Sequence, residues 1–178
     1  MIEKKIFDLI QNNKKPISLE KFIDICLFSK EGYYLNANPL GKKGDFTTSS
    51  EVSQLFGEII GLFILNYWQK NINEKFNFIE LGPGKGTLLI DILRITKSFT
   101  NFHNKMDIHL IEKNNHLRII QKNNFSFNNF NKINIRWHEN FIINNKKPLI
   151  IIANEFFDCF PIRQFKKINE KWNELKVN

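Results

Sequence analysis

A glycine-rich turn that directly follows an apolar segment constrains the fold of this chain more than any other feature. Residues 76–81 are mostly apolar, the turn GPGKG occupies residues 82–86, and a helical pattern begins at Thr87. Glycines tolerate positive φ angles and allow a ligand to approach the backbone closely. A strand, a glycine-rich turn and a helix in this order are typical of a site at the carboxyl end of a parallel sheet that binds an adenosine-containing ligand.

The spacing of the glycines distinguishes between three kinds of ligand for this turn. A nucleoside-triphosphate loop requires Gly-x-x-x-x-Gly-Lys-Ser/Thr, but Lys85 precedes the last glycine. A dinucleotide fingerprint requires its third glycine three positions after the second, where Thr87 stands, so NAD is the weaker alternative. S-adenosylmethionine (SAM) is favoured because Glu80 places a carboxylate beside the turn, and a sulfonium favours anionic surroundings. A tight turn without any ligand is the structural alternative.

Beyond Asn71, short apolar runs alternate with helical patterns, which predicts β-α-β units and a doubly wound parallel sheet. The predicted strands are residues 76–81, 107–112, 133–137 and 149–153, with helices near residues 86–97 and 115–122. The chain ends soon after the fourth of these strands, so we expect an α/β sheet that is incomplete at the carboxyl terminus.

The first 70 residues predict a helical N-terminal extension with a lid loop at residues 32–50, followed by the sheet domain over residues 71–178. A first helix starts near Ile2, and Ser18 is placed to cap a second helix that ends before Gly32. Thr48 and Glu51 have the spacing of a capping box, which predicts a third helix that runs to Trp68 and is buried on most sides.

Polar residues at the ends of two predicted strands are candidate site residues. Glu112 ends the second strand, where a carboxylate can accept hydrogen bonds from both ribose hydroxyls, although it is also compatible with an exposed strand-end charge. Asn154, Glu155 and Asp158 follow the fourth strand and are candidates for holding an acceptor amine or guanidinium in line with the methyl group. A turn capped by Asn154 and Asp158 before Pro161 is the alternative interpretation.

Composition excludes several functional classes. The lysines behind the net charge of +8 are scattered, which favours a solvated basic surface over a nucleic-acid groove. Cys26 and Cys159 have no metal-ligand spacing, so no metal is expected, and a reducing cytoplasm fits them best. The N-terminus shows no signal or transit peptide, and the longest apolar run, residues 59–68, is too short to span a membrane. We therefore expect a cytoplasmic protein with no membrane partner.

Four segments together resemble the MidA-like methyltransferase family, which includes the mitochondrial complex I assembly factor that methylates arginine. These segments are EGYY at residues 31–34, GDFTTS at residues 44–49 with Glu51, ELGPGKGTL at residues 80–88 and NEFFD at residues 154–158. Ser50 and Cys159 depart from the family pattern, and family members are about twice as long as this chain, as expected of a full methyltransferase domain with insertions.

The resemblance implies a Rossmann-like class I methyltransferase sheet of seven strands, with SAM as the methyl donor. It implies a protein arginine as acceptor, and a subunit of respiratory complex I is one candidate partner. The loop at residues 44–49 would help to close the cofactor pocket. The expected cofactor-binding residues are Glu80, Gly82, Gly84, Gly86, Thr87, Glu112, Gly44, Asp45 and Phe46.

The leading functional hypothesis is a SAM-dependent methyltransferase that acts on protein arginine, with Glu155 orienting the acceptor. The alternative is a non-catalytic assembly or interaction module that retains the fold. A nucleic-acid methyltransferase is disfavoured because residues 154–157 read NEFF instead of the Asn/Asp-Pro-Pro-aromatic motif expected for a flipped base.

Overall fold

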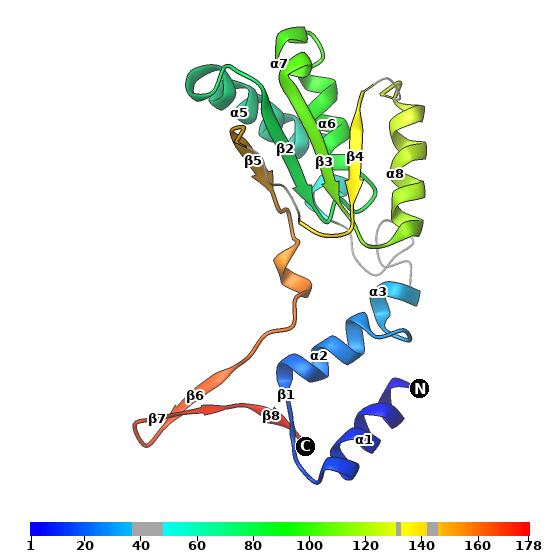
Figure 1. The fold of residues 1–178 in the computed structure, drawn as a ribbon, viewed down its shortest axis with the longest axis vertical. Helices are drawn as coiled ribbons and strands as arrows, with labels where there is room; N and C mark the ends of the chain where they lie inside the picture. Colours follow the sequence, from blue (N-terminus) through cyan, green and yellow to red (C-terminus); the bar gives the residue numbers. More distant parts are fainter. Residues whose placement is uncertain (37–47, 131–132, 142–145) are drawn as a thin grey trace. The chain divides into compact units, whose positions relative to one another are not determined.

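The computed structural model describes residues 1–36, 48–130, 133–141 and 146–178. The chain divides into two compact units (Figure 1). Unit 1 combines residues 1–39 with residues 157–178, and unit 2 comprises residues 40–156. This division does not coincide with the predicted segments 1–70 and 71–178. Among the described residues, no helix is both long enough and apolar enough to cross a membrane.

Unit 2 is built on a parallel four-stranded sheet with the strand order β4-β3-β2-β5 (Figure 1). The strands are β2 (Phe76–Leu81), β3 (Met106–Ile111), β4 (Ile135–His138) and β5 (Leu149–Ile152). The predicted α/β fold with parallel strands is confirmed, and each predicted strand lies within two residues of the observed one. Because β2 is central, the turn after it lies between the carboxyl ends of β3 and β5.

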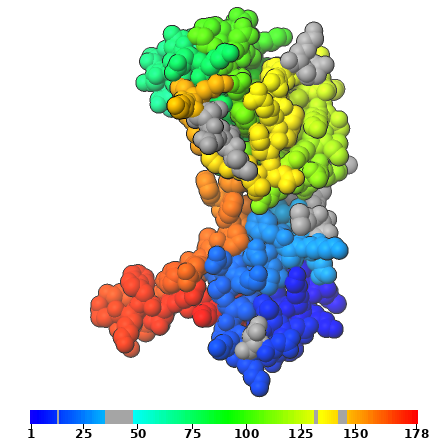
Figure 2. Space-filling view, viewed as in Figure 1, coloured from blue at the N-terminus to red at the C-terminus, as the bar shows by residue number. Residues whose placement is uncertain are grey.

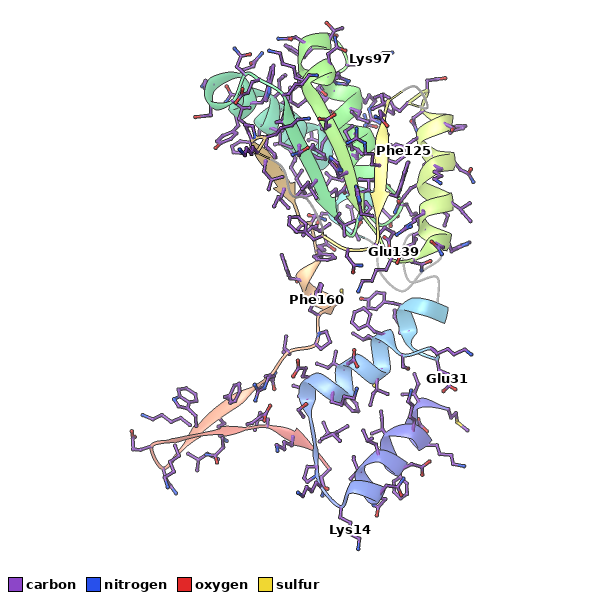
Figure 3. All side chains as sticks on the ribbon, viewed as in Figure 1. Lys14, Glu31, Lys97, Phe125, Glu139 and Phe160 are labelled. Carbon is purple, nitrogen blue, oxygen red and sulfur yellow. The ribbon has the colours of Figure 1, made fainter. Side chains whose placement is uncertain are left out.

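Four helices of unit 2 pack on one face of this sheet. They are α5 (Gln54–Asn71), α6 (Thr87–Ile95), α7 (Thr100–Lys105) and α8 (Asn115–Phe127). Alternate side chains of β2 and β3, among them Phe78, Ile108 and Leu110, meet these helices in one apolar core. Phe125 of α8 belongs to this core and is labelled in Figure 3. One face of the two inner strands, β2 and β3, is therefore covered by a continuous apolar core.

Helix α5 packs against α6 through glycines, which is why it belongs to the sheet unit. A Cβ atom at Gly61 would lie only 2.7 Å from Cγ2 of Ile95, so only glycine permits this approach. The prediction that this helix is buried on most sides is wrong. Its inner side is buried, whereas five large apolar side chains on the remainder are exposed: Leu55, Ile59, Leu62, Phe63 and Tyr67.

The predicted capping box at Thr48 is also wrong. A short helix α4 (Ser49–Val52) precedes α5, and the chain is extended at Ser53 between them. The Thr48 side chain makes no capping hydrogen bond and instead contacts the Ser50 hydroxyl at 3.1 Å. Glu51 is paired elsewhere, as described below, so it does not return to the start of the helix.

Unit 1 contains the N-terminal helices and the C-terminal strands. Its elements are α1 (Ile2–Asn13), β1 (Ile17–Ser18), α2 (Leu19–Phe28), α3 (Tyr33–Asn36), the 3-10 helix η1 (Phe157–Cys159), β6 (Phe165–Ile168), β7 (Lys171–Glu174) and β8 (Lys176–Val177). The predicted Ser18 cap is confirmed, because its hydroxyl accepts a hydrogen bond from the Lys21 amide at 3.2 Å. Helix α2 ends at Phe28, earlier than predicted.

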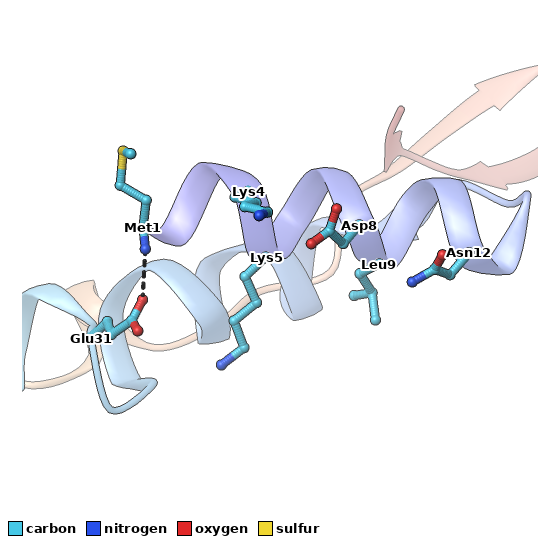
Figure 4. A pocket seen from close by; sticks show the side chains of 7 residues that line it. All are labelled: Met1, Lys4, Lys5, Asp8, Leu9, Asn12 and Glu31. Atoms are coloured by element: carbon cyan, nitrogen blue, oxygen red, sulfur yellow. Dashed lines mark hydrogen bonds and ion pairs between the residues drawn. The ribbon is translucent and has the colours of Figure 1, made fainter.

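The strands of unit 1 were not predicted. β6 and β7 form an antiparallel hairpin, shown in red in Figure 2, and β8 pairs with β1 from the opposite end of the chain. A shallow open groove lies along α1, lined by Met1, Lys4, Lys5, Asp8, Leu9, Asn12 and Glu31 (Figure 4). The ion pair between the Met1 ammonium and Glu31 closes one end of it at 3.3 Å. The groove contains none of the predicted site residues.

Candidate functional site

The turn after β2 has the backbone conformation that its glycines predicted. Gly82, Gly84 and Gly86 have φ angles of 61°, 56° and 79°, all in the left-handed region that favours glycine. The Gly82 amide donates to the carbonyl of Ile111 at 3.0 Å, and the Gly86 amide donates to the carbonyl of Pro83 at 2.8 Å. These bonds fix the turn against the end of β3, and α6 begins at the next residue, Thr87.

Aromatic rings of the protein itself lie against two of the three glycines. A Cβ atom at Gly82 would lie 2.5 Å from Cδ2 of Phe156, which follows β5. A Cβ atom at Gly86 would lie 3.0 Å from Cζ of Phe125. Packing against these rings is therefore a further reason for glycine at these two positions, besides positive φ and close approach of a ligand.

Helix α8 holds the turn through two side-chain amides that the sequence analysis missed. Gln121 is fully buried, and its Nε2 donates to the carbonyl of Gly84 at 2.7 Å while its Oε1 accepts from Nε1 of Trp137 at 2.7 Å. Nδ2 of Asn124 donates to the carbonyl of Lys85 at 2.9 Å. Neither residue gave a sequence signal, because both lie in an Asn-rich stretch that reads as a solvated helix.

Glu80 is a buried carboxylate immediately before the turn. The residue is 3% exposed, and its Oε2 has no hydrogen-bond partner within the described residues. Burial raises the pKa of Glu80 to about 8. An unpaired buried carboxylate is costly, and a cation placed beside it would favour the ionised form. The position therefore suits a positively charged ligand group.

Glu112 follows β3 and lies close to the turn. Its amide donates to the carbonyl of His138 at 2.9 Å, and its Oε1 accepts from the Asn114 amide at 2.8 Å. Burial raises the pKa of Glu112, and hydrogen bonds, including one with the Gln121 side chain, oppose that rise. Because Gln121 also contacts Gly84, the structure brings Glu112 and the glycine turn together, as predicted from the strand order.

The polar residues after β5 are less buried. Glu155 has a φ of 50°, and its Oε1 accepts hydrogen bonds from the amide of Ser49 at 2.9 Å and from its hydroxyl at 2.6 Å. The Ser49 side chain, the Ser49 backbone and the Asn154 side chain hold the pKa of Glu155 below its usual value. Asp158 lies in η1 of unit 1. Gly44, Asp45 and Phe46 lie outside the described residues.

An ion pair joins α4 to the glycine turn. Nζ of Lys85 lies 3.0 Å from Oε1 of Glu51, with the side chains 26% and 14% exposed. Oε2 of Glu51 is buried and has no partner among the residues that the structure describes. The capping-box spacing predicted a helix-cap role for Glu51, and no sequence pattern predicted a role for Lys85. In the described ranges, no group of three His, Cys, Asp or Glu residues could hold a metal ion.

A parallel sheet with a glycine turn after its central strand and an acidic residue after the next strand defines a Rossmann-like α/β domain. A family model described as "Putative S-adenosyl-L-methionine-dependent methyltransferase" matches residues 59–178. The chain belongs to this family of S-adenosyl-L-methionine-dependent methyltransferases.

Curated relatives carry a more specific name. The chain is 33% identical to the bovine "Protein arginine methyltransferase NDUFAF7, mitochondrial" over 92% of its own length and 42% of the relative's. The human protein of that name is 32% identical over the same shares of the two chains. The chain thus spans less than half the length of the curated relatives that it matches.

A solved structure shows the same fold. It is a COG1565 superfamily member from Burkholderia thailandensis bound to S-adenosyl-homocysteine, with a TM-score of 0.78 and 20% sequence identity. The match covers 97% of this chain and 46% of that one. This similarity supports the class I methyltransferase fold inferred from the resemblance.

The comparisons contradict the expectation of a cytoplasmic protein. The bovine, human and Drosophila relatives are all named as mitochondrial proteins. The cytoplasmic expectation rested on the cysteines and on the character of the N-terminal residues, and neither is specific enough to identify a compartment.

Proposed function

We propose that this chain binds SAM and takes part in the transfer of its methyl group to a protein arginine. The observation that carries the proposal is the buried carboxylate of Glu80, whose Oε2 lacks a partner among the described residues, directly before a turn with three left-handed glycines. A sulfonium or ammonium cation beside this carboxylate would supply an opposite charge and so favour its ionised form.

The residues around the turn fit this cofactor. Gly82, Gly84 and Gly86 would bring backbone close to it, Thr87 would lie at the start of α6, and Glu112 would accept hydrogen bonds from the ribose hydroxyls. Bound SAM would supply an electrophilic methyl group. Gly44, Asp45 and Phe46 remain proposed pocket residues on the basis of the family resemblance.

The acceptor side of the proposed reaction depends on Glu155 and Asn154. The hydrogen bonds from Ser49 favour the ionised form of the Glu155 carboxyl, and a carboxylate can hold a guanidinium by charge and hydrogen bonding. Methyl transfer mainly requires alignment of the acceptor nitrogen, which is the role we give to Glu155, with Asn154 as a further contact. The named activity of the NDUFAF7 relatives supports arginine, and a complex I subunit is the narrower proposal for the protein substrate.

A non-catalytic assembly module is the second candidate function. A protein of this kind would bind SAM or keep the fold without transferring a methyl group.

Isothermal titration with SAM tests the proposal. The wild-type chain is expected to bind, and Gly84→Val is expected to weaken binding by about 100-fold, because a β-branched residue is strained at positive φ and its side chain enters ligand space. Far-UV circular dichroism and a thermal melt check that the variant remains folded. A folded wild-type chain that does not bind SAM would overturn the proposal.

Transfer is measured separately from binding. The chain is incubated with SAM and arginine-containing peptides, and methylarginine is sought by mass spectrometry. Donor-dependent methylarginine supports the enzyme, and its loss in Glu155→Ala supports the assigned acceptor residue. Binding of SAM without any methylarginine supports the non-catalytic module.

A further inference from the structure

The ion pair between Glu51 and Lys85 differs from the other ion pairs of unit 2 in its position. Lys85 stands between two glycines of the turn, and its backbone carbonyl is already held by Asn124. Glu51 contacts the Lys85 ammonium from α4, which is distant from the turn in sequence. The pair therefore places one positive and one negative side chain directly at the proposed cofactor turn.

One oxygen of the Glu51 carboxylate has no hydrogen-bond partner among the described residues. Oε1 of Glu51 contacts Lys85, whereas its buried Oε2 has no donor within the described ranges. A buried carboxylate oxygen without a donor destabilises the protein, and such atoms in folded proteins call for an explanation. An ammonium group carries three donors and matches this requirement.

The strand order gives the direction in which a ligand would lie. Glu112, the proposed ribose ligand, follows β3 on one side of β2. Helix α4 lies toward the other side, because its residue Ser49 binds Glu155, which follows β5. A ligand whose ribose contacts Glu112 and which crosses the end of β2 therefore directs its opposite end toward α4.

We infer that Glu51 and Lys85 recognise the zwitterionic amino-acid end of the cofactor, with the Glu51 carboxylate accepting from the ligand ammonium and the Lys85 ammonium donating to the ligand carboxylate. The inference rests on the proposed function, since it assigns two further residues to the same site. It makes the pair a determinant of specificity, because adenosine derivatives that lack the amino-acid portion gain nothing from it.

Two ligands separate this inference from a purely structural ion pair. S-adenosyl-homocysteine contains the zwitterion, and 5′-methylthioadenosine keeps the adenosyl thioether without it. By titration calorimetry, Glu51→Gln is expected to weaken the binding of S-adenosyl-homocysteine about tenfold. The affinity for 5′-methylthioadenosine is expected to stay within about twofold of the wild-type value. Lys85→Met is expected to show the same selective loss and serves as the second variant if Glu51→Gln does not fold.

Glu58→Gln is the matched control. Glu58 also forms a partly buried ion pair, with Arg94 at 3.4 Å, but it does so between α5 and α6. This variant is expected to bind both compounds like the wild type. Equal losses for the two compounds in Glu51→Gln and Lys85→Met, or no loss for either compound, would overturn the inference while leaving the proposed function intact. Failure of the wild type to bind either compound would reject the proposed function and the inference with it.

Discussion

The two sides of the turn after β2 are built differently. On the β3 side, side-chain amides of α8 hold the carbonyls of Gly84 and Lys85, and Glu112 lies next to the buried Gln121. On the β5 side, the exposed carboxylate of Glu155 is held by Ser49 from a four-residue helix. The cofactor side is thus part of the core, whereas the acceptor side depends on a short element at the surface. Substitutions on the two sides should therefore have different consequences.

The largest expected effect concerns the pH dependence caused by Glu80. Its pKa is raised from 4.5 to about 8 in the folded state, so the folded protein binds more protons than the unfolded chain between these values. Stability then falls as pH rises through this interval, by at most on the order of 5 kcal/mol. Glu80→Gln should remove this slope. Urea unfolding at both ends of the interval measures it, and parallel wild-type and variant profiles would contradict the assignment.

The next largest effect is expected at Gln121. Replacing it by leucine leaves the Gly84 carbonyl and Trp137 Nε1 without their buried partner, which should cost about 2 kcal/mol of unfolding free energy. Asn124→Leu removes one hydrogen bond at a less buried position and should cost about half as much. Urea denaturation compares the two variants. Equal losses of unfolding free energy in the two variants would mean that the deeper burial of Gln121 does not make its hydrogen bonds more important for stability.

The smallest effect is expected on the acceptor side. Ser49→Ala removes the hydroxyl that donates to Glu155, so the pKa of Glu155 should rise toward its ordinary value. Carboxyl carbon NMR measures this shift, and the affinity for S-adenosyl-homocysteine should stay within about twofold. Ser50→Ala is the control, because its hydroxyl contacts Thr48. A Glu155 pKa that is the same in both variants would show that the Ser49 hydroxyl does not hold it.

Local patterns predicted the sheet because each strand is a short apolar run between polar turns. They could not predict β8, which exists only through pairing of Val177 with Ile17 at the other end of the chain. They also misjudged α5, since a helix that is apolar on all sides carries no information about which side is covered. Phe63, for example, is apolar but lies on the exposed side of this helix.

The same distinction applies to the site. The shared position of the glycine turn and Glu112 was predictable, because strand order alone places both at one edge of the sheet. The contact of Gln121 with the turn was not predictable, because it is made to a backbone carbonyl, and every residue has such a carbonyl. Ser49 was not, because it meets Glu155 across 106 positions of sequence. Contacts that depend on tertiary packing leave no periodic signal.

The edge strand β5 affects how the chain behaves in solution. Its side chains Leu149 and Ile151 are 44% and 45% exposed, and an exposed apolar edge strand is a surface at which copies of a chain can associate. The net charge of +8 repels copies at longer range, and added salt shortens the range of that repulsion. Ionic strength therefore determines whether repulsion or apolar attraction dominates between molecules.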